Sequence, residues 1–197
     1  MDMNANDGIA ANREYKDRLF TFIFGKEENR PYLLQLYNAL NGTSYTDPSE
    51  LEITTLQDVI YIRQKNDISF LLDSELSLYE QQSSYNPNMP LRGLMYFSAL
   101  YRQFLSRQGT DLYSSSLVKI PSPRYVVFYN GLRELPDVSK LRLSDAFEIP
   151  NESGEFEWTA TVYNVNAGRN SAIMESCVAL APVSYTHLRA HETLANL

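Results

Sequence analysis

Three polar side chains near the middle of the chain have the types and the spacing of a metal-dependent hydrolytic site. Asp67 opens the apolar segment DISFLL, and Glu80 and Gln82 stand two positions apart in the later segment LSLYEQQ. Side chains alternate between the faces of a strand, so Glu80 and Gln82 would share one face. Two carboxylates on adjacent strands can hold one Mg²⁺ and leave positions open for water and a phosphate oxygen. An exposed polar sheet edge is the alternative that this spacing leaves open.

The elements that must position these residues are short strands. Runs of β-branched and aromatic residues between turn residues are typical of strands. Asp73-Ser74 is the expected turn that brings Asp67 near Glu80, with Tyr79 and Gln81 on the opposite face. We expect strands at residues 51–56, 58–62, 67–72, 76–82, 125–129 and 156–164.

Helices are predicted where apolar residues recur every three or four positions. Such patterns cover residues 12–24, a second segment from a cap at Asn29 to Gly42, residues 91–108, and a segment that begins at Ser171. The buried face expected for the long third helix consists of Leu94, Phe97, Tyr101 and Phe104. With no internal repeat or linker, the order of helices and strands indicates a single mixed α/β domain.

Composition restricts the classes of function. The chain has 197 residues, 44% hydrophobic and 12% aromatic, which is typical of one globular domain. It has no apolar run of about 18 residues, as a membrane span requires, and its start does not resemble a signal peptide. A single cysteine, Cys177, cannot form an intramolecular disulfide. We therefore expect a cytoplasmic protein without a membrane partner.

The net charge of −7 is distributed unevenly. Residues 81–133 carry a net charge of +5, so the remainder carries −12. This stretch permits a phosphate-facing surface, although ordinary solvated charges are the alternative. Arg92 follows a proline-rich loop at the start of the long helix, where an arginine suits a phosphate; a solvated or structural arginine is the alternative. The basic residues are Arg92, Arg102, Arg107, Lys119, Arg124 and Arg133.

The sequence of the C-terminal segment suggests that it is not part of the natural protein. Residues 182–193, PVSYTHLRAHET, are similar to a translated transposon-end adapter of the kind used to make sequencing libraries. We expect a flexible N-terminus at residues 1–11, one domain at 12–181 that is cut short between Cys177 and Ala181, and a non-native tail at 182–197 that packs against nothing. The only histidines, His187 and His191, lie in this tail, so we assign them no zinc site.

The segment KNDISFLLDSELSLYEQQSSYNPNMPLRGLMYFSALY resembles the core of the Rpn-type recombination-promoting nucleases and transposases, which belong to the PD-(D/E)XK superfamily. YEQQSSYNPNMPLRG is its most specific part, and a weaker resemblance extends from about Tyr15 to Val178. The family motif commonly reads EHQ, whereas this chain has Gln81 in the middle position. The resemblance implies a central mixed β-sheet flanked by helices, as in restriction endonucleases.

The same resemblance implies hydrolysis of DNA phosphodiester bonds with Mg²⁺ or Mn²⁺ as cofactor. Asp67 and Glu80 would be the metal ligands, and Gln82 would stand where the wider superfamily has lysine. A neutral amide cannot act as a base, but it can orient the attacking water. Asp17, in a D-x-x-F pattern that the family shares, is a candidate extra acidic group, with a surface aspartate as the alternative.

We therefore expect a metal-dependent DNA endonuclease associated with a mobile element. One alternative is a catalytically inactive, transposon-derived DNA-binding or interaction domain. A second alternative is an interaction domain that does not bind nucleic acid, which would fit the acidic net charge better. The sequence leaves the oligomeric state open, with a homodimer as one option.

Overall fold

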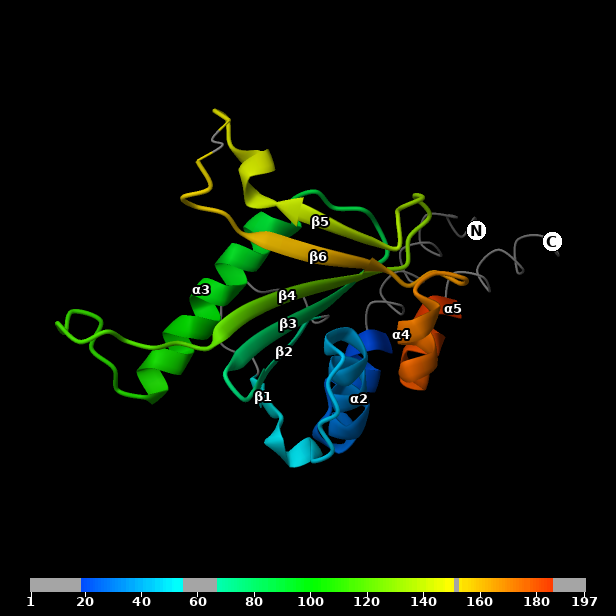
Figure 1. Cartoon of the computed structure of the whole chain (residues 1–197), viewed down its shortest axis with the longest axis horizontal. Coiled ribbons are helices and arrows are strands. Elements are labelled where there is room, and N and C mark those ends of the chain that lie inside the picture. Colours follow the sequence, from blue (N-terminus) through cyan, green and yellow to red (C-terminus); the bar gives the residue numbers. More distant parts are fainter. Residues whose placement is uncertain (1–18, 55–66, 151–152, 186–197) are drawn as a thin grey trace, which may run out of the picture.

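The computed structural model describes residues 19–54, 67–150 and 153–185. In these ranges the chain forms a six-stranded mixed sheet with helices on both faces (Figure 1). The expectation of a mixed sheet flanked by helices is thus confirmed. The expected strand at residues 58–62, the first part of the helix at 12–24, Asp17 and both histidines lie outside the described residues.

The sheet has the strand order β1-β2-β3-β4-β6-β5. The pairs β3–β4 and β4–β6 are parallel, whereas β1–β2, β2–β3 and β5–β6 are antiparallel. Parallel neighbours need a crossover connection, and the helix α3 supplies it between β3 and β4. The strands are β1 (Glu52–Thr54), β2 (Asp67–Leu72), β3 (Glu75–Gln82), β4 (Ser122–Tyr129), β5 (Val138–Arg142) and β6 (Thr159–Asn164).

The turn between β2 and β3 lies where the sequence predicts it. Asp73 adopts a left-handed conformation, with φ of 52°, which short polar side chains tolerate better than most. This turn sets the register of the hairpin so that Asp67 lies directly opposite Glu80. The hairpin therefore brings together the two carboxylates that the sequence singles out.

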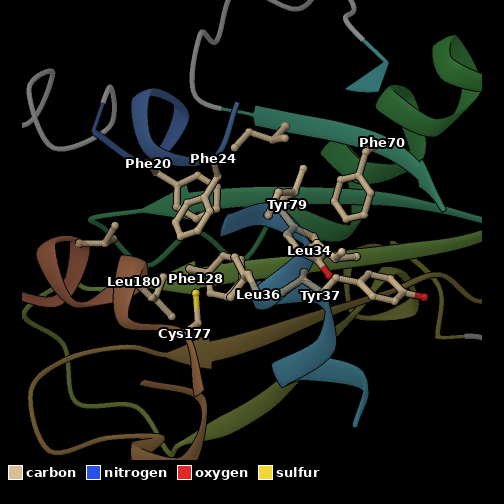
Figure 2. Packing of buried hydrophobic residues seen from close by; sticks show 14 of the residues in the cluster. Phe20, Phe24, Leu34, Leu36, Tyr37, Phe70, Tyr79, Phe128, Cys177 and Leu180 are labelled. Carbon is tan, nitrogen blue, oxygen red and sulfur yellow. The ribbon is translucent and has the colours of Figure 1, made fainter. Parts of the chain in front are cut away.

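One face of the sheet packs against α2 (Arg30–Asn41), the helical residues 19–24 and the C-terminal helices. The core on this face contains Phe70, Tyr79 and Phe128 from three neighbouring strands. Ring contacts run from Phe20 through Phe128 and Tyr79 to Phe70. Figure 2 shows Phe20 beside Phe24 and Cys177 beside Leu180. The free thiol of Cys177 is fully buried in this core.

The other face packs against α3 (Met89–Arg107). Its core contains Leu76 and Leu78 from β3, alternate residues of β4, and Phe97 and Leu100 from the helix. The buried face of α3 differs from the predicted one, because Phe104 and Leu94 are only half-buried. The helix instead buries a face that contains Met89, Pro90, Gly93, Tyr96, Phe97 and Leu100.

Gly93 explains why the buried face of α3 is rotated. A Cβ atom built at this position would lie 2.5 Å from the Tyr125 ring and 2.8 Å from the Trp158 indole nitrogen. Only glycine allows the helix backbone to approach the sheet so closely. An apolar stripe cannot reveal such a contact, since the residue that makes it has no side chain.

The C-terminal part differs from the sequence-based prediction in two respects. The helix expected from Ser171 ends at Ser176, and a 3₁₀ turn (Val178–Leu180) and the short helix α5 (Ala181–Tyr185) follow. Cys177, with φ of −132° and ψ of 83°, breaks the helical pattern. The edge strand β5 has alternating half-exposed residues and no apolar run, and it was not predicted.

The prediction that everything from Pro182 onward packs against nothing is wrong for Val183 and Ser184. Both are buried, and Val183 belongs to the core around Phe128. Asn130 also donates a hydrogen bond of 2.8 Å to the Val183 carbonyl oxygen. The origin of a segment does not determine its packing: a valine on a short helix buries its side chain wherever an apolar surface receives it.

Candidate carboxylate site

Asp67 and Glu80, the carboxylate pair, project from directly opposed positions of β2 and β3. They lie on the α3 face of the sheet, as shown by the alternation with Ile68 and Tyr79, which belong to the core on the other face. Directly opposed side chains in an antiparallel pair have Cβ atoms about 5 Å apart. The expectation that both carboxylates share one face is therefore confirmed, and an exposed sheet edge is excluded, because Glu80 is fully buried.

Glu80 is surrounded by hydrogen-bond donors. Its Oε1 atom accepts from the guanidinium of Arg92 and from the side-chain amide of Gln82. The Tyr125 hydroxyl donates to Oε2 at 2.6 Å. Burial is the largest effect and raises the pKa of Glu80 above its ordinary value, although Arg92, Tyr125 and Gln82 act in the opposite direction. Three donors, one of them charged, favour the ionised form of this carboxylate.

Asp67 has a different environment. Both of its carboxylate oxygens are buried, and neither is in hydrogen-bonding geometry with a donor among the described residues. Burial raises the pKa of Asp67 well above its ordinary value, the charge of Glu80 raises it further, and Arg92 and the Tyr96 hydroxyl act in the opposite direction. A proton shared by the pair therefore resides on Asp67.

Gln82 and Gln81 lie on opposite faces of β3, as predicted. Gln82 is half-buried and contacts Glu80. Gln81 is buried on the other face, where its amide donates to the Asn130 side chain at 2.6 Å. Gln81 thus connects the sheet to Asn130, which holds α5, and has no contact with the carboxylate pair.

Arg92 is the residue whose contact sequence reasoning missed. It lies in the first turn of α3, and its side chain is 20% exposed. Its guanidinium pairs with Glu80 and donates to the Tyr96 hydroxyl at 3.0 Å. The sequence placed Arg92 at a helix start but could not show that this start faces Glu80. Tyr96 and Tyr125, which the sequence analysis did not assign to the site, are also part of it.

The basic residues of the stretch 81–133 do not form one group. Arg133 stacks on the Tyr85 ring, 4.2 Å from its centroid, just beyond the ends of β3 and β4. Arg107 pairs with Glu52 at 3.3 Å, and Glu52 lies opposite Leu71 at the other end of β2. Arg92 and Arg133 are therefore the basic residues at the end of the sheet where Glu80 lies.

The donor set fits a hard divalent cation in part. The Asp67 oxygens are available, and Glu80 Oε2 accepts a hydrogen bond from Tyr125 while keeping a second lone pair. Oxygen ligands are those that Mg²⁺ and Mn²⁺ prefer. In the described ranges, no group of three or more histidine, cysteine, aspartate or glutamate side chains could hold a metal ion. Among the described residues, the carboxylate pair would thus offer a metal ion two carboxylates.

Within those ranges there is also no helix with the length and apolar character that crossing a membrane requires. Comparison of the chain with models of protein families, with curated proteins and with solved structures finds no match.

Proposed function

We propose that this protein is a metal-dependent endonuclease that hydrolyses DNA phosphodiester bonds. The observation that carries the proposal is the placement of Asp67 directly opposite Glu80, both on one face of the sheet and both largely removed from water. Burying two carboxylates side by side is costly unless a cation or a proton accompanies them. Such an arrangement is characteristic of functional sites.

Asp67 and Glu80 would hold Mg²⁺ or Mn²⁺. When bound, the ion supplies an acidified water and a positive charge next to the scissile phosphate. Gln82 uses its amide nitrogen on Glu80, which leaves its carbonyl oxygen as an acceptor. That oxygen can orient a water molecule but cannot remove its proton, so the proton passes to solvent or to a phosphate oxygen.

Plasmid nicking tests this proposal. With Mg²⁺ or Mn²⁺ the chain should convert supercoiled plasmid to open circles, and a chelator should stop the reaction. Asp67→Asn and Glu80→Gln should abolish nicking, whereas Gln82→Ala should retain a small part of it. Glu134→Gln, which changes an exposed carboxylate, is the control and should nick normally. Nicking by Asp67→Asn at the rate of the unmodified chain would disprove the mechanism.

A second candidate function is an inactive DNA-binding or interaction domain. The observation in its favour is the ion pair between Arg92 and Glu80, which already satisfies Glu80 without a metal ion. This candidate predicts DNA binding that is unaffected by divalent cations, with no nicking under any condition. Gel shifts with and without Mg²⁺, run beside the nicking assay, distinguish the two functions.

A further inference from the structure

Glu80 is a carboxylate that one cation already neutralises. The Arg92 guanidinium contacts Oε1 of Glu80, and the carboxylate has no exposed surface. Arg92 itself keeps some access to solvent, since a fifth of its side chain is exposed. The buried charge of Glu80 is therefore balanced by a side chain that reaches it from the border of the site.

A divalent cation held by Asp67 and by Oε2 of Glu80 would bind the same carboxylate whose Oε1 atom Arg92 contacts. Both cations would lie within contact distance of Glu80, where little water screens their repulsion. Simultaneous occupation is therefore unfavourable. The guanidinium can leave Glu80 by rotation of the Arg92 side chain, which is a fifth exposed and whose contacts with Tyr96 and the Met89 sulfur are on its own helix.

We propose that Arg92 is an internal competitor of the metal ion: its guanidinium and a divalent cation bind Glu80 in mutually exclusive fashion. Arg92 is thus a positioning residue that stabilises the buried carboxylate pair until a cation replaces it. The inference rests on the proposed function, because it assumes that Asp67 and Glu80 hold a divalent cation. It goes further because it states that Arg92 weakens metal binding, whereas a residue that supports a metal site would strengthen it.

Direct measurement of Mn²⁺ binding tests the competition without any DNA cleavage. The loss of the electron paramagnetic resonance signal of free Mn²⁺ reports binding to the full chain. Arg92→Gln removes the competing charge and should tighten Mn²⁺ binding more than about tenfold, since close charge pairs couple by more than the equivalent energy. Arg102→Gln, an exposed change on the same helix, is the control and should bind as the unmodified chain does.

Unfolding measurements provide the second readout. Without Mn²⁺, Arg92→Gln should melt at a lower temperature than the unmodified chain, because Glu80 loses its counter-charge. With Mn²⁺, its melting temperature should rise more than that of the unmodified chain. A merely structural arginine would give the first effect without the second. Should Arg92→Gln fail to fold even with Mn²⁺, Arg92→Met, which removes the charge but keeps a long side chain, decides, with tighter binding in support and equal binding against.

The outcomes separate the two proposals. Equal or weaker Mn²⁺ binding by Arg92→Gln, combined with loss of binding in Asp67→Asn, overturns the competition and leaves the proposed metal site standing. No Mn²⁺ binding by any of the chains overturns both. Tighter binding by Arg92→Gln that disappears when Asp67→Asn is added is the result that the competition requires.

Discussion

At the scale of single residues, the carboxylate pair combines two side chains of the same type in unlike environments. Glu80 receives three donors, whereas Asp67 has buried oxygens without a described donor. The unlike surroundings decide which carboxylate stays ionised and which one takes up a proton. Sequence can name both residues, but only the packing of α3 and β4 against them distinguishes their states.

The raised pKa of Asp67 predicts a specific dependence of stability on pH. The folded state binds the Asp67 proton more tightly than the unfolded chain does. Its stabilising effect is complete below about pH 4, the ordinary aspartate value, and is lost as the pH rises through the raised pKa. The unmodified chain should therefore lose stability relative to Asp67→Asn as the pH rises from about 4 towards neutral.

Urea denaturation at a series of pH values measures this difference. The gap between the free energies of unfolding of Asp67→Asn and the unmodified chain should widen with increasing pH in a buffer without divalent cations. Asp145→Asn, an exposed change, should show no such widening. A gap that narrows with increasing pH would mean that the Asp67 pKa is lowered by folding.

The Tyr125 hydroxyl gives a second prediction at this scale. Tyr125→Phe keeps the ring in the core and removes the 2.6 Å hydrogen bond to Glu80. Because the acceptor is a carboxylate, the loss should cost about 1.5–3 kcal/mol of unfolding free energy. Tyr101→Phe removes a 2.8 Å bond to the carbonyl oxygen of Pro121, a neutral acceptor, and should cost about 1 kcal/mol. Equal losses in chemical denaturation would argue against an ionised Glu80.

At the scale of secondary-structure elements, α3 positions the site by its close approach to the sheet. Gly93 faces Tyr125 and Trp158, and Arg92 and Tyr96 stand on either side of it along the helix. The contact that packs the helix thus also sets the distance from Arg92 to Glu80.

Gly93→Ala tests this role of α3. Alanine favours a helix over glycine by up to about 1 kcal/mol, but its Cβ would lie 2.5 Å from the Tyr125 ring, and such overpacking costs about 1–3 kcal/mol. We expect a net loss of stability in thermal denaturation. Ser98→Ala, an exposed change on the same helix, should be neutral or slightly stabilising. A Gly93→Ala chain as stable as the Ser98→Ala chain would show that the helix can move away at no cost.

Much of the local structure follows from the sequence, and the long-range contacts do not. The β2–β3 hairpin, the face shared by Glu80 and Gln82, and the end of α2 at Gly42 are set by side-chain alternation and turn chemistry within a few residues. Two of the three donors to Glu80 come from α3 and β4, 12 and 45 residues away along the chain. No local pattern records such contacts. The edge strand β5 was missed because an exposed strand needs no apolar run.

At the scale of the whole molecule, the two faces of the sheet pack against different helices and have different contents. The α3 face carries the carboxylate site, and the other face carries the core of Phe128, Cys177 and Val183. Two hydrogen bonds connect β3 to the last helix: Gln81 donates to Asn130, and Asn130 donates to the Val183 carbonyl oxygen. The C-terminal helix α5 is thereby connected to the strand that carries Glu80.

This connection predicts that α5 contributes to stability, in contrast to the expectation from the adapter-like sequence. A chain ending at Ala181 lacks the buried Val183 side chain and leaves the Asn130 amide without its acceptor. Loss of a buried aliphatic side chain and of one buried hydrogen bond should together cost about 2–5 kcal/mol. A chain ending at Tyr185 keeps both interactions and is the matched control.

Differential scanning calorimetry should therefore show a melting temperature several degrees lower for the chain ending at Ala181 than for the chain ending at Tyr185. Val183→Ala in the full chain should produce part of that decrease, because it removes the side chain but keeps the carbonyl oxygen that Asn130 contacts. Identical melting temperatures for the two shortened chains would instead show that residues 182–185 contribute nothing to the fold, as their sequence alone suggests.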